Sequence, residues 1–180
     1  AEELSRSQFY HLVAVSSHSA DEQTVRDRLG ASVYRNVAEL IASEKPDVLL
    51  VATPHMKHAE TVELALKAGI HVICEKPLTV SPAEATSLHQ LSERSKGRLT
   101  VVSQTRFEPT YQNLHSTIST ERLGDLLRCH ITETFLRTDH YYQTADWRGT
   151  WAGEGGGVLV NQATHILDRY RWLCGRPDSI

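Results

Sequence analysis

Short apolar runs alternate with amphipathic segments over residues 11–104 of the chain. Apolar runs typical of buried strands lie at residues 11–17, 47–53, 70–75 and 98–104. Segments with helical periodicity lie between or beside them, at residues 19–30, 36–44, 57–69 and 81–97. Strands that alternate with helices in this way predict βαβ units, and therefore an α/β fold with a doubly wound parallel sheet.

Several residues mark where these elements begin, end or become buried. Ser19 and Glu22 have the spacing of a capping box, and Gly30 can end the helix that they start. Ser81, which a proline follows, is expected as the N-cap of the fourth helix. Residues 47–53 (DVLLVAT) form a nearly continuous Val/Leu run, which predicts a strand buried on both faces.

The alternation changes after residue 106. A helix is expected near residues 108–120, and residues 127–136 (LRCHITETFL) have the period of a strand. A polar, aromatic connection then leads to one last helix. One strand and one or two helices are too few to close a sheet. We therefore divide the chain into one domain at 1–106 and the beginning of a second α/β domain at 107–180.

Composition narrows the classes of function. The chain has 180 residues, 40% of them hydrophobic, and a formal net charge of −3. This charge gives no electrostatic reason to expect nucleic acid or an anionic membrane as a partner. No apolar run approaches the roughly 20 residues of a membrane span. Cys74, Cys129 and Cys174 are few and widely spaced, which predicts buried free thiols and a cytoplasmic protein.

Polar residues follow the ends of the predicted strands. Ligands of an open parallel sheet bind beyond the carboxyl ends of its strands. Polar residues at a single strand end usually have only a structural role in the loop. Polar residues at several strand ends along one edge of the sheet favour a binding site. Lys76 is the sharpest candidate, because Pro77 restricts its backbone and a partly dry lysine can exchange a proton. The four ends carry Ser16-Ser17-His18, Thr53-Pro54-His55, Glu75-Lys76-Pro77, and Gln104 with Arg106.

The last helix carries the second chemical signal. Its apolar stripe is predicted at Leu159, Ala163, Ile166, Tyr170 and Leu173. The opposite side carries Asn161, His165, Asp168 and Trp172. A solvated face would not usually include a tryptophan. Two interpretations of His165 stay open: a structural histidine, or an oriented imidazole that exchanges a proton near neutral pH.

Other common motifs are absent from the sequence. His55 and His58 have a spacing that could serve a metal, but no thiolate or carboxylate cluster accompanies them, so no metal site is expected. Neither the GxGxxG fingerprint, nor a GxSxG elbow, nor a P-loop occurs.

Four stretches of the chain resemble the glucose–fructose oxidoreductase / inositol dehydrogenase (Gfo/Idh/MocA) family. They are VAVSSHS, DVLLVATPHMKHAETVELALKAGIHVICEKPLT, VVSQTRFEPTY and DWRGTWAGEGGGVLVNQATHILDRYRWLCG. The resemblance implies a Rossmann domain followed by an α/β domain with a large open sheet. It also implies binding of NAD or NADP and hydride transfer to or from a sugar, cyclitol or related molecule.

The resemblance assigns roles to residues of this chain. Lys76 corresponds to the lysine of the family's EKP motif, which contacts the substrate hydroxyl, and His165 to its usual acid/base. The positions expected to line the cofactor are Ser17, His18, Thr53, Pro54, His58, Glu75, Lys76 and Gln104. The positions expected near the substrate are Lys76, Arg106, Trp147, Arg148, Asn161 and His165.

The chain departs from the family pattern in three places. Asn161 stands where many members have aspartate, and an amide cannot take a proton. Ser17 stands near the position of the ribose-binding acid of NAD-preferring members, which leans the cofactor slightly toward NADP. The family's first strand and glycine-rich phosphate loop are expected before Ala1, and most of its C-terminal sheet after Ile180.

These features predict an NAD(P)-dependent oxidoreductase of a polyol or sugar-like substrate, with a homo-oligomer as the full-length form. The alternatives are a non-catalytic NAD(P)-binding sensor or regulatory homologue, or an inactive fragment of a longer protein. Asn161 keeps the sensor interpretation open, whereas Lys76 and His165 favour the enzyme.

Overall fold

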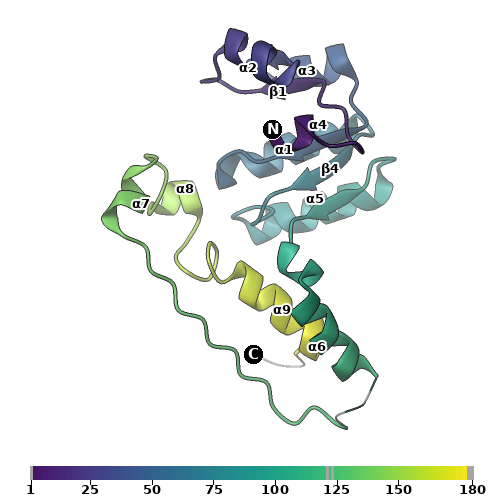
Figure 1. Cartoon of the computed structure of the whole chain (residues 1–180), viewed down its shortest axis with the longest axis vertical. Helices are drawn as coiled ribbons and strands as arrows, with labels where there is room; N and C mark the ends of the chain where they lie inside the picture. The colour runs from purple at the N-terminus through teal and green to yellow at the C-terminus, as the bar shows by residue number, and fades with distance from the viewer. Residues whose placement is uncertain (1, 121, 123, 178–180) are drawn as a thin grey trace. The chain divides into compact units, whose positions relative to one another are not determined.

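The computed structural model describes residues 2–120, 122 and 124–177. Its elements alternate between strands and helices up to β5 and are helical afterwards (Figure 1). The strands are β1 (Ala14–Ser16), β2 (Ser32–Tyr34), β3 (Val48–Val51), β4 (His71–Cys74) and β5 (Leu99–Val101). The α-helices are α1 (Glu2–Ser5), α2 (Glu22–Leu29), α3 (Val37–Glu44), α4 (His58–Lys67), α5 (Pro82–Arg94), α6 (Pro109–Ser119), α7 (Asp139–Gln143), α8 (Trp151–Glu154) and α9 (Thr164–Cys174). Two 3-10 helices are η1 (His55–Lys57) and η2 (Gln104–Phe107).

The strands form two sheets among the described residues. β1 and β2 pair in parallel, with Ala14 opposite Ser32 and Ser16 opposite Tyr34. The second sheet has the order β3-β4-β5. The predicted α/β fold with parallel strands is confirmed, and the strands of the described residues divide between these two sheets. Strand β2 was not predicted, because three residues are too few to show the alternation of apolar and polar positions that marks a strand.

The chain packs into two compact units. Unit 1 comprises residues 1–51, 60–73 and 88–99, and unit 2 comprises residues 52–59, 74–87 and 100–180. The chain passes between the units several times, so their limits differ from the sequence division at residue 106. That division into two domains stays a prediction.

The core of unit 1 lies between α4 and the strands beside it. Val62, Ala65 and Leu66 of α4 are buried, as is Val72 of β4. The predicted two-sided burial of residues 47–53 is wrong, because Val48 and Leu50 of β3 are exposed. β3 lies at an edge of its sheet, and alternate side chains of a strand point to opposite faces.

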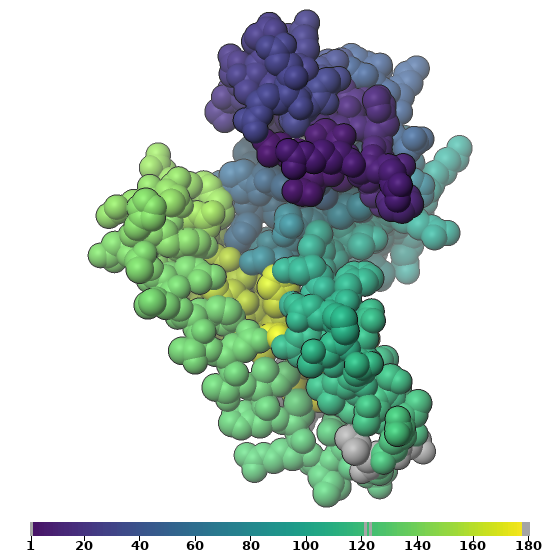
Figure 2. Space-filling view, viewed as in Figure 1, coloured from purple at the N-terminus to yellow at the C-terminus, as the bar shows by residue number. Residues whose placement is uncertain are grey.

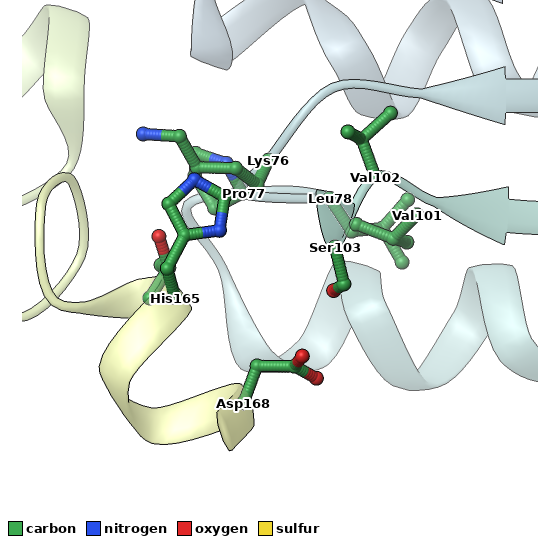
Figure 3. A pocket seen from close by; sticks show the side chains of 9 residues that line it. Lys76, Pro77, Leu78, Val101, Val102, Ser103, His165 and Asp168 are labelled. Atoms are coloured by element: carbon green, nitrogen blue, oxygen red, sulfur yellow. The ribbon is translucent and has the colours of Figure 1, made fainter. Parts of the chain in front are cut away.

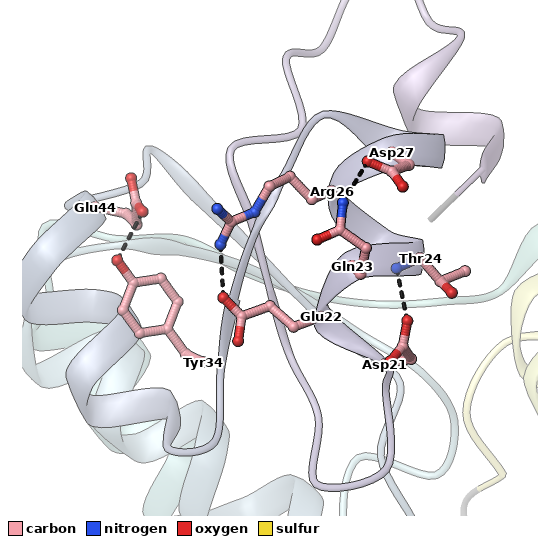
Figure 4. A network of polar contacts seen from close by, with 8 residues as sticks. All are labelled: Asp21, Glu22, Gln23, Thr24, Arg26, Asp27, Tyr34 and Glu44. Atoms are coloured by element: carbon pink, nitrogen blue, oxygen red, sulfur yellow. Dashed lines mark hydrogen bonds and ion pairs between the residues drawn. The ribbon is translucent and has the colours of Figure 1, made fainter.

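The caps of the helices differ in part from the predicted ones. Asp21, not Ser19, caps α2: its carboxylate accepts a hydrogen bond of 2.7 Å from the backbone N–H of Thr24 (Figure 4). Gly30 ends α2 with φ of 65°, as predicted. Ser81 accepts a hydrogen bond from the N–H of Glu84, which confirms the predicted start of α5.

Unit 2 is mainly helical, and α6 packs against α9 and η2 (Figure 1). The buried guanidinium of Arg169 on α9 donates to the hydroxyl of Tyr111 on α6 and to the carboxylate of Glu133. This contact attaches the segment around Glu133 to both helices.

The strand predicted at residues 127–136 does not form. The described residues 124–138 have no helix or strand, and Leu127 and Leu136 are 94% and 83% exposed. Figure 2 shows green atoms of this part of the chain on the surface. A strand is stable only when its backbone groups pair with a neighbour. No segment of the described residues pairs with this one.

The last helix begins later than its apolar pattern predicts. The backbone of residues 157–163 forms turns, in which the carbonyl of Gly157 accepts hydrogen bonds from the N–H groups of Val160 and Asn161. Leu159 therefore lies outside α9 and is 68% exposed. The predicted apolar stripe is wrong at Leu159 and at Tyr170, which is also exposed, and on α9 itself the buried side chain is Arg169.

All three cysteines are free thiols. Cys74 at the end of β4 is fully buried, and this burial, with the charge of Glu75, raises its pKa to about 12. Cys129 and Cys174 are only partly buried, which corrects the expectation of three buried thiols. Among the described residues, no helix has both the length and the apolar character that a bilayer crossing requires.

Candidate active site

Lys76 is held in place directly after β4. Glu75, Lys76 and Pro77 follow the last strand residue, and the Lys76–Pro77 peptide bond is cis. The Lys76 ammonium donates to the backbone carbonyl of Asn161 at 2.7 Å and to its side-chain Oδ1 at 3.3 Å. An ammonium has three donors. Asn161 therefore fixes two directions of the lysine and leaves one N–H for a ligand.

A buried carboxylate stands behind Asn161. Asn161 and Glu154 are each 5% exposed, and the Nδ2 group of Asn161 donates to Oε1 of Glu154. The other carboxylate oxygen accepts a 3.0 Å hydrogen bond from the N–H of Gly149. The amide of Asn161 is thereby oriented, with its nitrogen toward Glu154 and its oxygen toward Lys76. Sequence reasoning missed Glu154, although a charged residue beside a glycine run is a usable signal.

Lys76 and His165 line one cavity of unit 2. The cavity has a volume of about 260 Å³ and lies at the carboxyl ends of β4 and β5, beside the first turns of α9. Figure 3 shows the side chains of Lys76 and His165 near each other, with Asp168 one turn further along the helix. The lining residues are Lys76, Pro77, Leu78, Val101, Val102, Ser103, Thr164, His165 and Asp168.

The surroundings of the cavity lower the pKa of Lys76 and of His165. Burial lowers the pKa of Lys76, although the nearby carboxylate of Glu75 opposes this shift. Burial also lowers the pKa of His165 from the ordinary 6.5, and the positive charge of Lys76 lowers it further. A neutral imidazole beside an ammonium can accept a proton while the ammonium stabilises negative charge on the same oxygen.

Asp168, which lines the cavity, forms an ion pair with Arg106. The Arg106 guanidinium donates from Nε to Asp168 Oδ2 at 2.8 Å and from Nη2 to Oδ1 at 2.5 Å. This pairing raises the pKa of Arg106. Arg106 also lies 5.6 Å from the ring centre of Trp172, which stacks on His115 at 4.4 Å. The contacts of Trp172 explain why this face of the helix is not solvated.

Two histidines lie behind the strand ends. His58 is fully buried, and its ring nitrogens lie 2.7 Å from the carbonyl oxygen of Pro77 and 2.8 Å from that of Thr53. His58 therefore joins the loops after β3 and β4. His55 is 9% exposed, its Nδ1 has no hydrogen-bond partner among the described residues, and its ring lies 5.1 Å from that of Trp147.

The other positions expected to line the cofactor lie in both units. Thr53 and Gln104 are exposed, and Pro54 and Glu75 are half-buried, all in unit 2. These accessible groups at strand ends fit a dinucleotide, which binds at that edge of a parallel sheet. Ser17 and His18 belong to unit 1.

Arg35 joins the expected cofactor loop of unit 1 and was not found from the sequence. Its Nη1 donates to the carbonyl oxygens of Ser17, His18 and Ala20 at 2.9, 3.0 and 3.0 Å. The residue lies directly after β2, an element that the apolar pattern did not reveal.

Two family descriptions match the chain. Residues 1–103 match "Oxidoreductase family, NAD-binding Rossmann fold", and residues 111–180 match the "GFO/IDH/MocA C-terminal domain". An uncharacterized oxidoreductase of Schizosaccharomyces pombe is 31% identical over 151 residues, which are 82% of this chain and 39% of the relative. D-glucoside 3-dehydrogenase of Escherichia coli is 29% identical over 92% of this chain and 47% of the enzyme.

A solved structure gives the same fold. The WlbA dehydrogenase of Bordetella pertussis, in complex with NADH and UDP-GlcNAcA, has a TM-score of 0.82 and 28% identity over 92% of this chain and 51% of that chain. The present chain thus spans about half the length, or less, of these proteins. The fold and both family matches agree, and the chain belongs to the Gfo/Idh/MocA oxidoreductase family.

Proposed function

We propose that the protein is an NAD(P)-dependent oxidoreductase that transfers a hydride between nicotinamide and a hydroxyl or carbonyl group of a sugar or related polyol. The observation that carries this proposal is the shared cavity of Lys76 and His165 at the carboxyl ends of β4 and β5. The relative named D-glucoside 3-dehydrogenase and the WlbA complex with UDP-GlcNAcA support a sugar-like substrate.

The chain supplies the proton transfer and the charge stabilisation of this reaction. Bound NAD(P) would supply the acceptor for the hydride of the carbinol carbon, or its donor in the reverse direction. His165 takes the hydroxyl proton, because its lowered pKa keeps the imidazole neutral near pH 7. Lys76 donates its remaining N–H to the same oxygen and stabilises the developing negative charge. Asn161 cannot exchange the proton, so its role is to hold Lys76.

The residues proposed to hold the dinucleotide are those at the strand ends. Thr53, Pro54, Glu75 and Gln104 would line it, whereas buried His58 would act indirectly by joining two loops. Ser17 and His18 would face the adenosine ribose. Arg35 adds a guanidinium at that loop, which supports a preference for NADP because arginine suits a 2′-phosphate.

Two further features of the whole protein are proposals. The free cysteines support a reducing compartment, for which we propose the cytoplasm. The unpaired segment 127–136 and its exposed leucines support additional contacts in the full protein, for which we propose a homo-oligomer.

A non-catalytic NAD(P)-binding sensor is the second candidate. The amide of Asn161 favours it, because a carboxylate at this position would provide a further proton acceptor. The neutral His165 beside Lys76 favours the enzyme.

A substrate screen tests the proposed function. The purified protein is incubated with sugars and inositols and with NAD or NADP, and reduction is followed by nicotinamide absorbance. We expect turnover of at least one sugar or polyol, with a higher kcat/KM for NADP. Tight cofactor binding without turnover of any compound would support the sensor instead.

The pKa of His165 is expected to lie below 6.5 and to depend on Lys76. Replacing Lys76 by methionine removes a positive charge beside the imidazole, so the pKa of His165 should rise. Titration of the ring Cε1–H by NMR measures this, and His165→Asn assigns the signal. Lys67→Met, at an exposed ion pair of α4, is the control and should leave the titration unchanged. Titration of His165 above 6.5 in the unaltered protein would contradict the assignment.

A further inference from the structure

Two arginines of unit 2 lie against one tyrosine ring. The guanidinium carbon of Arg148 lies 4.5 Å from the ring centre of Tyr141, and that of Arg137 lies 5.1 Å from it. Arg148 also lies 4.7 Å from the ring centre of Trp147, and its Nη1 donates to the Tyr141 hydroxyl at 2.6 Å. Aromatic contacts thus orient both side chains while leaving much of their hydrogen-bonding capacity unused.

Neither arginine has an anionic partner within the described part of the chain. Arg137 donates only to the carbonyl oxygen of Leu136, at 3.0 Å, and the Nε of Arg148 is buried without a partner. Asp139 and Asp146 are near in sequence, but neither forms an ion pair with them in the described structure. A buried guanidinium N–H without an acceptor is costly, because charged donors lose strong hydrogen bonds with water.

Hydrogen bonds connect this arginine cluster to Lys76: Gly149, the neighbour of Arg148, donates to Glu154, and Glu154 accepts from Asn161, whose carbonyl oxygen accepts from Lys76. Burial is the main reason for the lowered pKa of Lys76, and the charges of Arg137 and Arg148 lower that pKa further. All three cations belong to unit 2. The carboxylate of Glu154 is already engaged by Asn161 and Gly149, which leaves Glu75 as the carboxylate that faces the lysine.

We propose that the substrate carries an anionic group, a carboxylate or a phosphate, which Arg137 and Arg148 bind beside Lys76. This inference rests on the proposed function and specifies its substrate class as a sugar acid or a sugar phosphate. The planar guanidinium forms paired hydrogen bonds with the oxygens of either group. Tyr141 sets the distance between the two arginines, and Lys76 remains available for the reacting hydroxyl.

The test compares three compounds that differ only at C6: D-glucose, D-glucuronate and D-glucose 6-phosphate. Calorimetry with the cofactor present measures their binding to the purified protein, and nicotinamide absorbance measures turnover. At least one of the two anions is expected to bind more tightly than glucose. Which of the two does so identifies the group as a carboxylate or a phosphate.

Arginine variants connect that preference to the site. Arg137→Gln and Arg148→Gln are each expected to weaken binding of the preferred anion about tenfold, which is typical of one charge-assisted hydrogen bond, and to change glucose binding little. The KM for the cofactor should stay the same. The control is Arg26→Gln, which removes an exposed arginine of α2 in unit 1 and should leave both affinities unchanged.

Equal binding of the three compounds, or absence of binding by both anions, would overturn the inference. An equal loss for glucose and for the anion in both variants would also do so. The proposed function is separable from this result. Turnover of neutral sugars alone would support the oxidoreductase function and contradict the anion site. Anion binding without turnover of any compound would support the anion site and contradict the oxidoreductase function.

Discussion

His165→Asn and Lys76→Met are each expected to reduce hydride transfer by ~10²–10⁴-fold, the usual contribution of a positioned acid/base or charge-stabilising group. Asparagine keeps a polar side chain of similar width but cannot take the hydroxyl proton. Methionine keeps the length of the lysine stem without its charge. Rates at saturating substrate measure the effect on kcat, and fluorescence titration should show that cofactor binding is retained.

Two exposed residues of the same types provide the controls. His89→Asn on α5 and Lys67→Met on α4 remove a histidine and a lysine that form only exposed i,i+4 pairs with glutamates. Both should keep full activity. Wild-type turnover in His165→Asn would show that another group takes the proton. Wild-type turnover in Lys76→Met would show that the lysine does not stabilise the oxyanion.

Glu154→Gln is expected to lower activity by about 10–100-fold, the equivalent of one hydrogen bond to a charged group. In the native network the carboxylate accepts hydrogen bonds from both Gly149 and Asn161. A glutamine can accept only from its oxygen, so its Nε2 donors would meet the Nδ2 donors of Asn161. Rotation of the Asn161 amide would relieve this contact, but it would turn donors toward the Lys76 ammonium.

Asn161→Asp is expected to disturb the same network by adding a negative charge, whereas Glu154→Gln removes one. It would place a second carboxylate against buried Glu154, and like charges in a buried site are unfavourable. We expect a lower Tm and reduced activity. The double variant Glu154→Gln/Asn161→Asp should restore matched hydrogen bonds. The oxygen of Gln at position 154 can accept from the N–H of Gly149, and its nitrogen can donate to Asp at position 161. That aspartate can also accept from the Lys76 ammonium. The contacts to Gly149 and Lys76 and the contact between the two side chains then each pair a donor with an acceptor, so activity should recover to within a few fold of the native value.

A double-mutant cycle measures this recovery as an interaction energy between the two positions. The pH dependence of kcat/KM provides a second readout, because the negative charge near Lys76 is moved and not removed. Additive losses in the double variant would show that Glu154 supports the fold only locally and does not position the lysine through Asn161.

Much of the structure of residues 11–104 is determined locally and can be predicted from the amino-acid pattern. Alternating apolar runs and caps such as Gly30 and Ser81 locate the helices and strands within a few residues, because backbone geometry and side-chain burial act over short distances. Prediction from the apolar pattern failed where the structure of a segment depends on neighbouring segments that pack or pair with it. Residues 127–136 have a strand's period but no neighbour in the described chain, and β3 is less buried than its composition suggests.

The candidate site also combines features that the sequence shows with features that only the folded structure shows. Lys76 and His165 stand out in the sequence, because a lysine fixed by proline at a strand end and a histidine on a helix face are local features. Their common cavity, the orientation of Asn161 by Glu154, and the two arginines against Tyr141 join residues far apart in the chain. Such contacts depend on how loops pack in three dimensions, and residue types at short spacings do not encode that packing. Local pattern thus identified the reactive groups, whereas long-range packing sets their protonation, their orientation and the charge around them.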